Sequence, residues 1–496
     1  MRFLTFIAGS VLLRISVALS GATCEEAWDK QKLTESDFLY HPSIHSSYNK
    51  FYQKINRKNC LKEWSVFIYM NADNDLTDHA LLDIKEMSKV GSSKAVDIVV
   101  QLDTCAKGVS RLHIAKSEDP SESAEVEKLK ELDSGSPTTF SDFLSWAALK
   151  YPSKHYAVIL WSHGLGIEGI SFDESSHPKV SIANSCHCEP ACGCGNLCQT
   201  LAEGSPSYIS IPQLRSVLSS FSAKFLRGKP IDVYGSDACL MQMLEVAYEF
   251  KKHVKYIVGS ANMEGKSGWP YEDILSALKE HPYDTPEYSD SAKSWVTQIP
   301  NLYQKKYHEK DERAVMTVIY AHELKRFFPY SFSDFGAALL GYIHEDQKHE
   351  ALRLQKIKYL MDKAFNYSGL STDLFHFTAL ISSELQGKPR SDLTKAEEEL
   401  LSALGHLQYA IGRVAPFMAV SPFYYTKDTF GFTRGLAAWL PIDPEEYRKK
   451  QSFYFDSKLY RMDMYLSKLF KKNGFVSFIK EINSKPLGSP FIRLKK

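Results

Sequence analysis

The stretch PIDVYGSDACLMQMLEVAY, residues 230–248, decides the fold that we expect for this chain. It begins with an apolar run of strand character at residues 231–234, and from Leu240 onward its apolar residues follow helical spacing. Cys239 therefore lies at the junction between a strand and a helix. The unpaired N–H groups and the positive dipole at the start of a helix favour an anion, so a thiol there ionises easily. Because open parallel sheets place reacting groups just beyond the carboxyl ends of strands, we expect Cys239 to be a nucleophile.

A second buried strand ends in a histidine that can act as the base for this thiol. Residues 157–161 form a continuous apolar run, typical of a strand buried on both faces, and His163 and Gly164 follow it closely. This pair suggests a cysteine hydrolase in which His163 transfers the proton and the backbone N–H groups of Gly164 and Cys239 hold the oxyanion. A cysteine at the end of a strand can equally be a small buried hydrophobic residue, so these residues alone leave both interpretations open.

Several spaced motifs resemble the signature blocks of the clostripain family of cysteine peptidases. They occur in the family's order between Trp64 and the 480s: 69–76, His163-Gly164, 237–241, 245–248, 268–271, Asp373-Leu374 and 435–441. The resemblance implies a caspase-like α/β fold, endopeptidase activity by a His163/Cys239 dyad, and self-cleavage between these two residues. It implies no cofactor for the chemistry and calcium as an activator, although no EF-hand-like spacing identifies a calcium site. A dyad of this type needs no buried aspartate to orient His163.

The resemblance also assigns residues to the pocket for the side chain that precedes the scissile bond. Asp237 matches the acidic floor of this pocket in the family, and its carboxylate would pair with Arg or Lys. Asp73 and Ser260 follow other strands at the same edge and complete the predicted pocket. Ser267 departs from the family pattern, because basic-specific relatives carry an acid just before Gly-Trp, which leaves Glu264 or Asp73 to assist Asp237. Turn capping for Asp237 and helix capping for Asp73 remain open as simpler roles.

Alternation of apolar runs with helical stretches predicts a mostly parallel sheet flanked by helices. We expect strands at 65–70, 95–102, 157–161, 231–234, 254–258 and 315–320, a hairpin near 110–115, and helices at 76–90, 139–149 and 212–221. Asp75 or Thr77 is the expected cap of the helix at 76–90. The alternative for Asp73, Asn74 and Asp75 is that they line the pocket at the same edge of the sheet as Cys239. After Lys325 the chain is largely helical, with amphipathic stretches at 335–343, 350–365 and 394–414, strands at 430–440 and two helices near Tyr454 and Val476.

The N-terminus has the pattern of a secretory signal peptide at residues 1–22, with Arg2, an apolar segment and small residues before the cleavage site. Arg14 interrupts the apolar segment, so a short amphipathic or membrane-anchoring start is the alternative. We divide the rest of the chain into an extension or pro-segment at 23–62, a caspase-like catalytic domain at 63–325 and a helical C-terminal region at 326–496. Since no later stretch has the ~18 apolar residues of a membrane span, we expect secretion or residence in a secretory or vesicular lumen.

The chain contains nine cysteines, and eight remain when Cys239 is set aside. An even number suits disulfides in an oxidising compartment. Five of the eight lie in CHCEPACGCGNLC, residues 186–198, within a predicted insert at 184–200. A metal knuckle that uses four of these thiolates, with or without His187, is the alternative to disulfides.

Two other function classes find little support in the sequence. Residues 164–169 fit the dinucleotide-binding pattern, but residues 170–178 do not open an amphipathic helix, so we expect a tight turn beside the oxyanion. The formal net charge of +1 over 496 residues gives no reason to expect binding to nucleic acid.

We therefore predict a cysteine endopeptidase that cleaves proteins or peptides after Arg or Lys. We expect a monomer or a self-processed two-chain form, and Lys179 is the candidate for self-cleavage because it lies in a loop between His163 and Cys239. A catalytically silent binding or processing partner on the same scaffold is the alternative.

Overall fold

The computed structural model describes residues 61–105, 108–118, 124–173, 207–308, 314–326, 328–367, 371–420 and 433–484. Apart from Leu61, these residues belong to one compact unit, Lys62–Lys496. The predicted signal peptide, the extension up to residue 60, Lys179 and the cysteine-rich insert lie outside the described residues. None of the described helices is long and apolar enough to cross a membrane.

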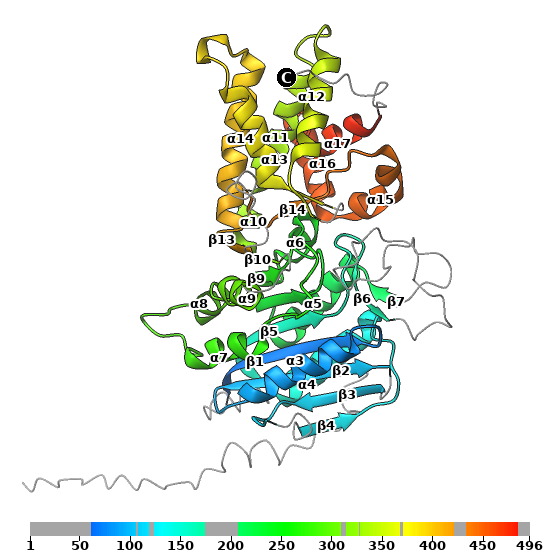
Figure 1. The fold of residues 1–496 in the computed structure, drawn as a ribbon, viewed down its shortest axis with the longest axis vertical. Coiled ribbons are helices and arrows are strands. Elements are labelled where there is room, and N and C mark those ends of the chain that lie inside the picture. The colour runs from blue at the N-terminus through cyan, green and yellow to red at the C-terminus, as the bar shows by residue number, and fades with distance from the viewer. Residues whose placement is uncertain are drawn as a thin grey trace, which may run out of the picture. The chain divides into compact units, whose positions relative to one another are not determined.

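A nine-stranded sheet forms the centre of this unit, in the order β13-β10-β9-β8-β5-β1-β2-β3-β4 (Figure 1). Its five central strands run parallel, and antiparallel strands complete both edges. This arrangement confirms the predicted α/β class. In chain order the strands are β1 (Lys62–Ala72), β2 (Val96–Thr104), β3 (Gly108–His113), β4 (Ala124–Lys128), β5 (Ser153–Trp161), β8 (Ile231–Asp237), β9 (Val254–Gly259), β10 (Val315–Tyr320) and β13 (Phe417–Val420).

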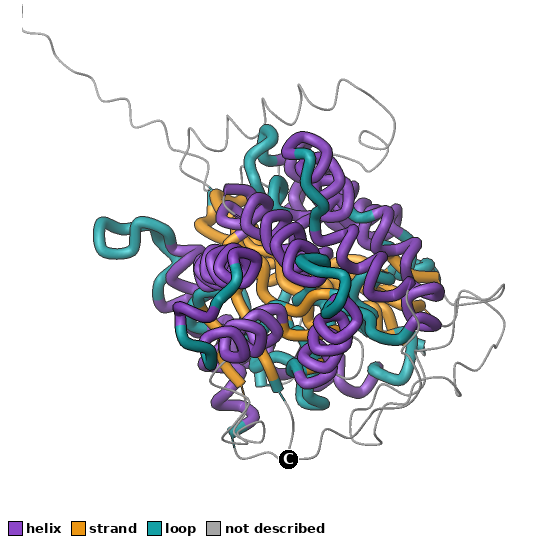
Figure 2. Tube along the Cα trace, turned by 90° about the horizontal axis from the view of Figure 1, so that it is seen from above, coloured by secondary structure: helices purple, strands orange, loops and turns teal. Residues whose placement is uncertain are grey.

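Helices cover both faces of the sheet, which explains the continuous apolar runs in the sequence (Figure 2). Every residue of β2 and of β8 is buried. One face packs against α3 (Thr77–Val90), α7 (Tyr271–Glu280), α8 (Ser291–Val296) and α9 (Ile299–Tyr307). The other face packs against α4 (Pro137–Lys150), α5 (Ile211–Phe225) and α6 (Leu244–Phe250).

The C-terminal region is largely helical, as predicted, with a few differences. Helix α13 and a third helix near the C-terminus were not expected from the sequence, and of the strands expected at 430–440 the described residues contain β14. The elements are α10 (Ala321–Arg326), α11 (Phe328–Ile343), α12 (Glu350–Lys363), β11 (Asn366–Tyr367), β12 (Ser371–Asp373), α13 (Leu374–Gln386), a 3-10 turn (Arg390–Asp392), α14 (Lys395–Val414), β14 (Ala437–Ala438), α15 (Pro444–Asp456), α16 (Lys458–Phe470) and α17 (Phe475–Ser484).

The segment after Cys239 is bonded to both halves of the chain. Gln242 donates its side-chain N–H to the carbonyl of Thr317 in β10 at 2.7 Å, and its own carbonyl accepts from the N–H of Ala437 at 3.1 Å. The buried carboxylate of Glu245 accepts from the N–H of Trp439 at 3.0 Å. Strand β13, which lies beyond the predicted domain boundary at 325, likewise pairs with β10. The C-terminal region therefore completes the surroundings of the Cys239 segment.

Candidate active site

The parallel pairing of β5 with β8 brings His163 and Cys239 to matching positions. Trp161 pairs with Asp237 in the register, and each candidate residue follows two positions later. Between them the backbones approach closely, because a Cβ atom on Gly164 would lie 2.5 Å from the carbonyl oxygen of Cys239. Glycine is therefore required at position 164. His163 and Cys239 both lie at the carboxyl edge of the sheet, as predicted.

Cys239 is held by the loop that follows β9, and not by a helix. Its side chain is 7% exposed, and its sulfur accepts the backbone N–H of Glu264 at 3.2 Å. The next residue, Leu240, has φ 64° and donates its N–H to the carbonyl of Asn262 at 2.9 Å. Helix α6 begins only at Leu244, so the prediction of a helix directly after the thiol is wrong. The N–H of Glu264, not a helix dipole, is positioned to stabilise negative charge on the sulfur.

A carboxylate for which the sequence left helix capping and a place in the pocket open contacts His163. Nε2 of the buried His163 lies 2.6 Å from Oδ1 of Asp75, whose side chain is 51% exposed. The N-cap of α3 is Leu76, which has no side-chain cap, and its N–H is bound by the Oδ1 of Asn74 at 2.9 Å. Asp75 therefore holds one ring nitrogen of His163, Nε2, and fixes the orientation of the imidazole.

Three buried acids form a group beside Cys239: Asp237 and Glu264 interact with its thiol, and Asp83 interacts with Asp237. Asp237 accepts a hydrogen bond from the hydroxyl of Tyr271 at 3.0 Å, and Asp83 of α3 accepts one from the indole of Trp161 at 2.8 Å. Glu264 is bound by the Tyr303 hydroxyl and by the Trp269 indole. Asp237 was predicted for this pocket and Glu264 was named as its assistant. Asp83 was missed, because an acid on an amphipathic helix gives no local signal.

Burial dominates the electrostatics of this acid group. It raises the pKa of Asp237 to about 7, and together with the charge of Asp237 it raises the pKa values of Glu264 and Asp83 well above their usual range. The ammonium of Lys306 lowers the pKa values of Asp237 and Asp83. It lies 3.0 Å from Glu86 Oε1 and donates to the Trp269 carbonyl at 3.0 Å. Two of the three acids, Asp237 and Asp83, thus share the charge of one lysine that also contacts Glu86.

The other predicted pocket residues lie in different surroundings. The structure groups Asp73 with two further buried acids, Asp103 and Asp173. Ser260 is buried and braces the loop after β9, since its carbonyl accepts from the N–H of Gln242 at 2.9 Å and its hydroxyl accepts from the N–H of Asn262 at 3.1 Å. Asp73 and Ser260 both lie at the predicted edge of the sheet. The contacts described here for these two residues do not involve Asp237.

The glycine-rich segment after His163 is a turn, as expected. Gly164 forms a bridge with Ile170, and the N–H of Leu165 donates to the carbonyl of Gly169 at 2.9 Å. A short strand, β6 (Ile170–Asp173), follows and pairs with β7 (Ser207–Ile209). Dinucleotide binding would need a helix in the place of β6, so this fold does not support it.

Cys105 is the one cysteine of the predicted eight that lies among the described residues. It is exposed and forms no disulfide, and its thiol lies 3.6 Å from the carbonyl of Asn74. The other seven cysteines lie outside the described residues, so their pairing in disulfides stays a prediction.

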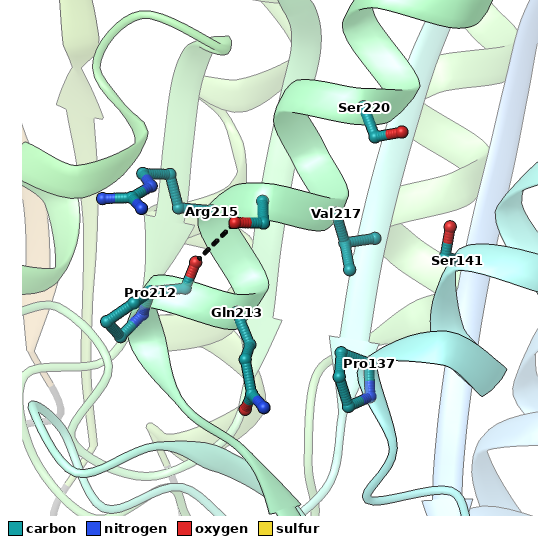
Figure 3. A pocket seen from close by; sticks show the side chains of 8 residues that line it. Pro137, Ser141, Pro212, Gln213, Arg215, Val217 and Ser220 are labelled. Atoms are coloured by element: carbon teal, nitrogen blue, oxygen red, sulfur yellow. Dashed lines mark hydrogen bonds between the residues drawn. The ribbon is translucent and has the colours of Figure 1, made fainter.

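A shallow groove between α4 and α5 has no catalytic arrangement (Figure 3). Its charged residue, Arg215, pairs with Glu249 at 2.8 Å, and the hydroxyl of Ser216 donates to the carbonyl of Pro212 at 3.1 Å. The remaining lining residues are Pro137, Ser141, Gln213, Val217 and Ser220.

Solved structures with the same fold are C11 cysteine proteases. The inactive zymogen from Parabacteroides distasonis is 17% identical, with a TM-score of 0.52 over 81% of this chain and 98% of the other. A secreted protease from Bacteroides thetaiotaomicron in complex with an irreversible peptide inhibitor is 18% identical, with a TM-score of 0.52 over 81% of this chain and 99% of the other. A search among curated proteins gave no match.

The sequence also matches a family model. The model of the clostripain family matches residues 68–184 and 196–359, a range that contains both His163 and Cys239. The break in the match, residues 185–195, falls within the predicted cysteine-rich insert. The match confirms the resemblance that the spaced motifs indicated. This chain belongs to the clostripain family of cysteine peptidases.

Proposed function

We propose that this peptidase is an endopeptidase that cleaves after Arg or Lys by means of a His163/Cys239 dyad. Cys239 attacks the peptide carbonyl, and the N–H groups of Gly164 and Cys239 bind the oxyanion. His163 protonates the leaving amine and later activates the water that releases the acyl group. Asp75 is a positioning residue, because it bonds Nε2 and fixes the orientation of the imidazole.

The observation that carries the preference is the group of buried acids beside Cys239. Asp237 and Glu264 flank the thiol, and burial raises the pKa of both. A guanidinium or ammonium group that enters this site supplies positive charge that Lys306 provides only in part, so the acids ionise when such a side chain binds. An apolar side chain brings no positive charge, so it does not favour ionisation of these acids.

The test is cleavage of a peptide panel that varies only the residue before the scissile bond, by wild type and by Cys239→Ala, with and without calcium. We expect hydrolysis after Arg or Lys by wild type and none by the variant, with equal melting temperatures for both. If wild type cleaves no peptide, even after nicking near Lys179 by another protease, the scaffold is a silent binding partner and the proposal is wrong.

We also propose self-cleavage between His163 and Cys239, with Lys179 as the site, because both dyad residues would remain in the processed form. Mass spectrometry of purified wild type should find a new N-terminus at residue 180. The same terminus should be absent from Cys239→Ala and from Lys179→Ala. A cut in the Cys239→Ala protein would show that another protease makes it.

The apparent signal peptide leads us to propose that the protein is secreted or enters a vesicular lumen. One structural neighbour is described as a secreted protease, which is compatible with this location. Expression of the full chain and of a chain without residues 1–22 should give export of the first only, with a mature N-terminus near residue 23.

A further inference from the structure

A second group of buried acids lies at the catalytic edge of the sheet. Asp73 follows β1, Asp103 is the penultimate residue of β2, and Asp173 is the last residue of β6. One ligand oxygen from each residue lies within 4.8 Å of the other two, and the side chains are 3%, 0% and 0% exposed. Three carboxylates this close together and removed from water require compensation by protons or by positive charge.

Hydrogen bonds compensate for only part of this charge. Ser134 donates its backbone N–H to Oδ2 of Asp173 at 2.7 Å and its hydroxyl to Oδ2 of Asp103 at 2.6 Å. The other oxygen of Asp103, Oδ1, is buried without a hydrogen-bond partner. The charged neighbours that act on Asp103 are Glu131, Asp73 and Asp173, all acids, which together with burial raise its pKa to about 7.

A neutral oxygen adds to the group. Asn71 pairs with Asp103 in the register of β1 and β2, so the two side chains lie on the same face of the sheet. Asn71 is fully buried, and its amide nitrogen donates to the hydroxyl of Ser171 at 3.1 Å. Its Oδ1 also has no hydrogen-bond partner. Two buried oxygens without donors, on neighbouring strands, are what a bound cation would satisfy.

We propose that Asp73, Asp103 and Asp173 bind a hard divalent cation, with Asn71 Oδ1 as a further ligand, and that calcium fits best. Calcium takes six to eight oxygen ligands at about 2.3–2.6 Å, so oxygens on opposite sides of one ion lie roughly 5 Å apart. The three acids are compatible with this spacing. Magnesium prefers a smaller octahedral site and retains more of its water, which suits a fully buried set of carboxylates less well.

The site is connected to His163 from two sides, so we infer that the cation positions the histidine; this step rests on the proposed function. Asp73 lies two residues before Asp75, whose carboxylate contacts His163. Asp173 ends β6, in which the N–H of Ser171 donates to the carbonyl of His163 at 3.0 Å. An ion that binds both acids fixes the segment that carries Asp75 and the strand that supports His163.

The binding test uses the full chain as the Cys239→Ala protein, so that self-cleavage does not interfere. After treatment with a chelator, added calcium should raise the melting temperature by roughly 3 °C at about 100 times its Kd. Terbium, which replaces calcium, should luminesce when tyrosine is excited, because the hydroxyl of Tyr69 donates to the Ser134 carbonyl beside the acids. Calcium should displace this signal.

Three variants test the assignment of the ligands. Asp103→Asn removes one buried negative charge, so it should raise the melting temperature without calcium and abolish the calcium shift. Asp173→Asn should also abolish the shift and the terbium signal. Glu350→Gln, in the more exposed group of His344, Glu350 and Glu481, is the matched control and should retain both. No calcium shift and no terbium signal in the parent protein, or a full shift in Asp103→Asn, would overturn the site.

Turnover is measured separately, with the wild-type cysteine. Removal of calcium should lower kcat more than it raises KM, because substrate binding does not use the site. If calcium binds but kcat does not change, the site stands and its connection to His163 is wrong. If calcium binds and no peptide is cleaved under any condition, the site stands and the proposed endopeptidase function fails.

Discussion

Replacement of Asp237 by asparagine should remove most of the preference for basic residues. The change keeps the size of the side chain and an oxygen for the hydroxyl of Tyr271. It removes a carboxylate that is 5% exposed, and buried charge pairs of this type are worth about 2–5 kcal/mol. Because Glu264 and Asp83 remain, we expect a loss of about 2–3 kcal/mol, which is roughly a 30- to 150-fold fall in kcat/KM for an arginine peptide.

The assay compares two peptides that carry arginine or its neutral isostere citrulline before the scissile bond. Asp237→Asn should lower kcat/KM for the first and leave the second nearly unchanged. Asp232→Asn is the matched control, since Asp232 is an equally buried acid at the opposite end of β8, where it pairs with His155 and Lys255. Equal losses for both peptides, or an unchanged ratio, would refute the assignment of the acid pocket.

Three further predictions concern the same site. Asp75→Asn should lower kcat about tenfold with little change in KM, because a half-exposed carboxylate that orients the imidazole of His163 is worth about 1.4 kcal/mol. The ratio of arginine to citrulline cleavage should fall as the pH drops below 7, since the raised pKa of Asp237 leaves its carboxyl protonated and neutral there, and it should level off above pH 7. Gly164→Ala should abolish turnover and destabilise the fold by about 1–3 kcal/mol, because its Cβ would stand 2.5 Å from the carbonyl oxygen of Cys239.

Each of these predictions has a control in the chain. Asp78→Asn changes an exposed acid in the first turn of α3 and should leave kcat unchanged. A pH dependence of the same size for both peptides would show that Asp237 is not the titrating group. Gly412→Ala places a methyl group in open space on helix α14 and should not lower the melting temperature. Full activity of Gly164→Ala would contradict the close approach of the two backbones.

The sequence was sufficient to predict the central strands and the places of Cys239 and His163. Strands buried on both faces need unbroken apolar runs, and β5 and β8 show such runs directly. The positions of the two residues then follow from the common edge at which parallel strands end. The family motifs also predicted a role for Asp237. Because Asp237 is only two residues before Cys239 in the sequence, it must lie near the thiol.

Features that depend on distant contacts could not be predicted. The apolar spacing after Cys239 resembled a helix, but Leu240 adopts φ 64° because its N–H bonds to the carbonyl of Asn262. Helix capping and a place in the pocket were both open for Asp75, and its contact with His163 joins residues 88 positions apart. Strand β13 was missed because only four residues at 417–420 pair with β10, after a long helical stretch.

The pairing of β13 with β10 has a consequence for any attempt to produce the catalytic part alone. A protein that stops at residue 325 would lose β13, so β10 would become an unprotected strand at the margin of a large sheet. Such a strand exposes unpaired backbone N–H and C=O groups that can pair with strands of other molecules, so it promotes aggregation. The same truncation would remove the Trp439 N–H that donates a hydrogen bond to the buried carboxylate of Glu245. Solubility in the test tube, and not only turnover, should therefore depend on the C-terminal region.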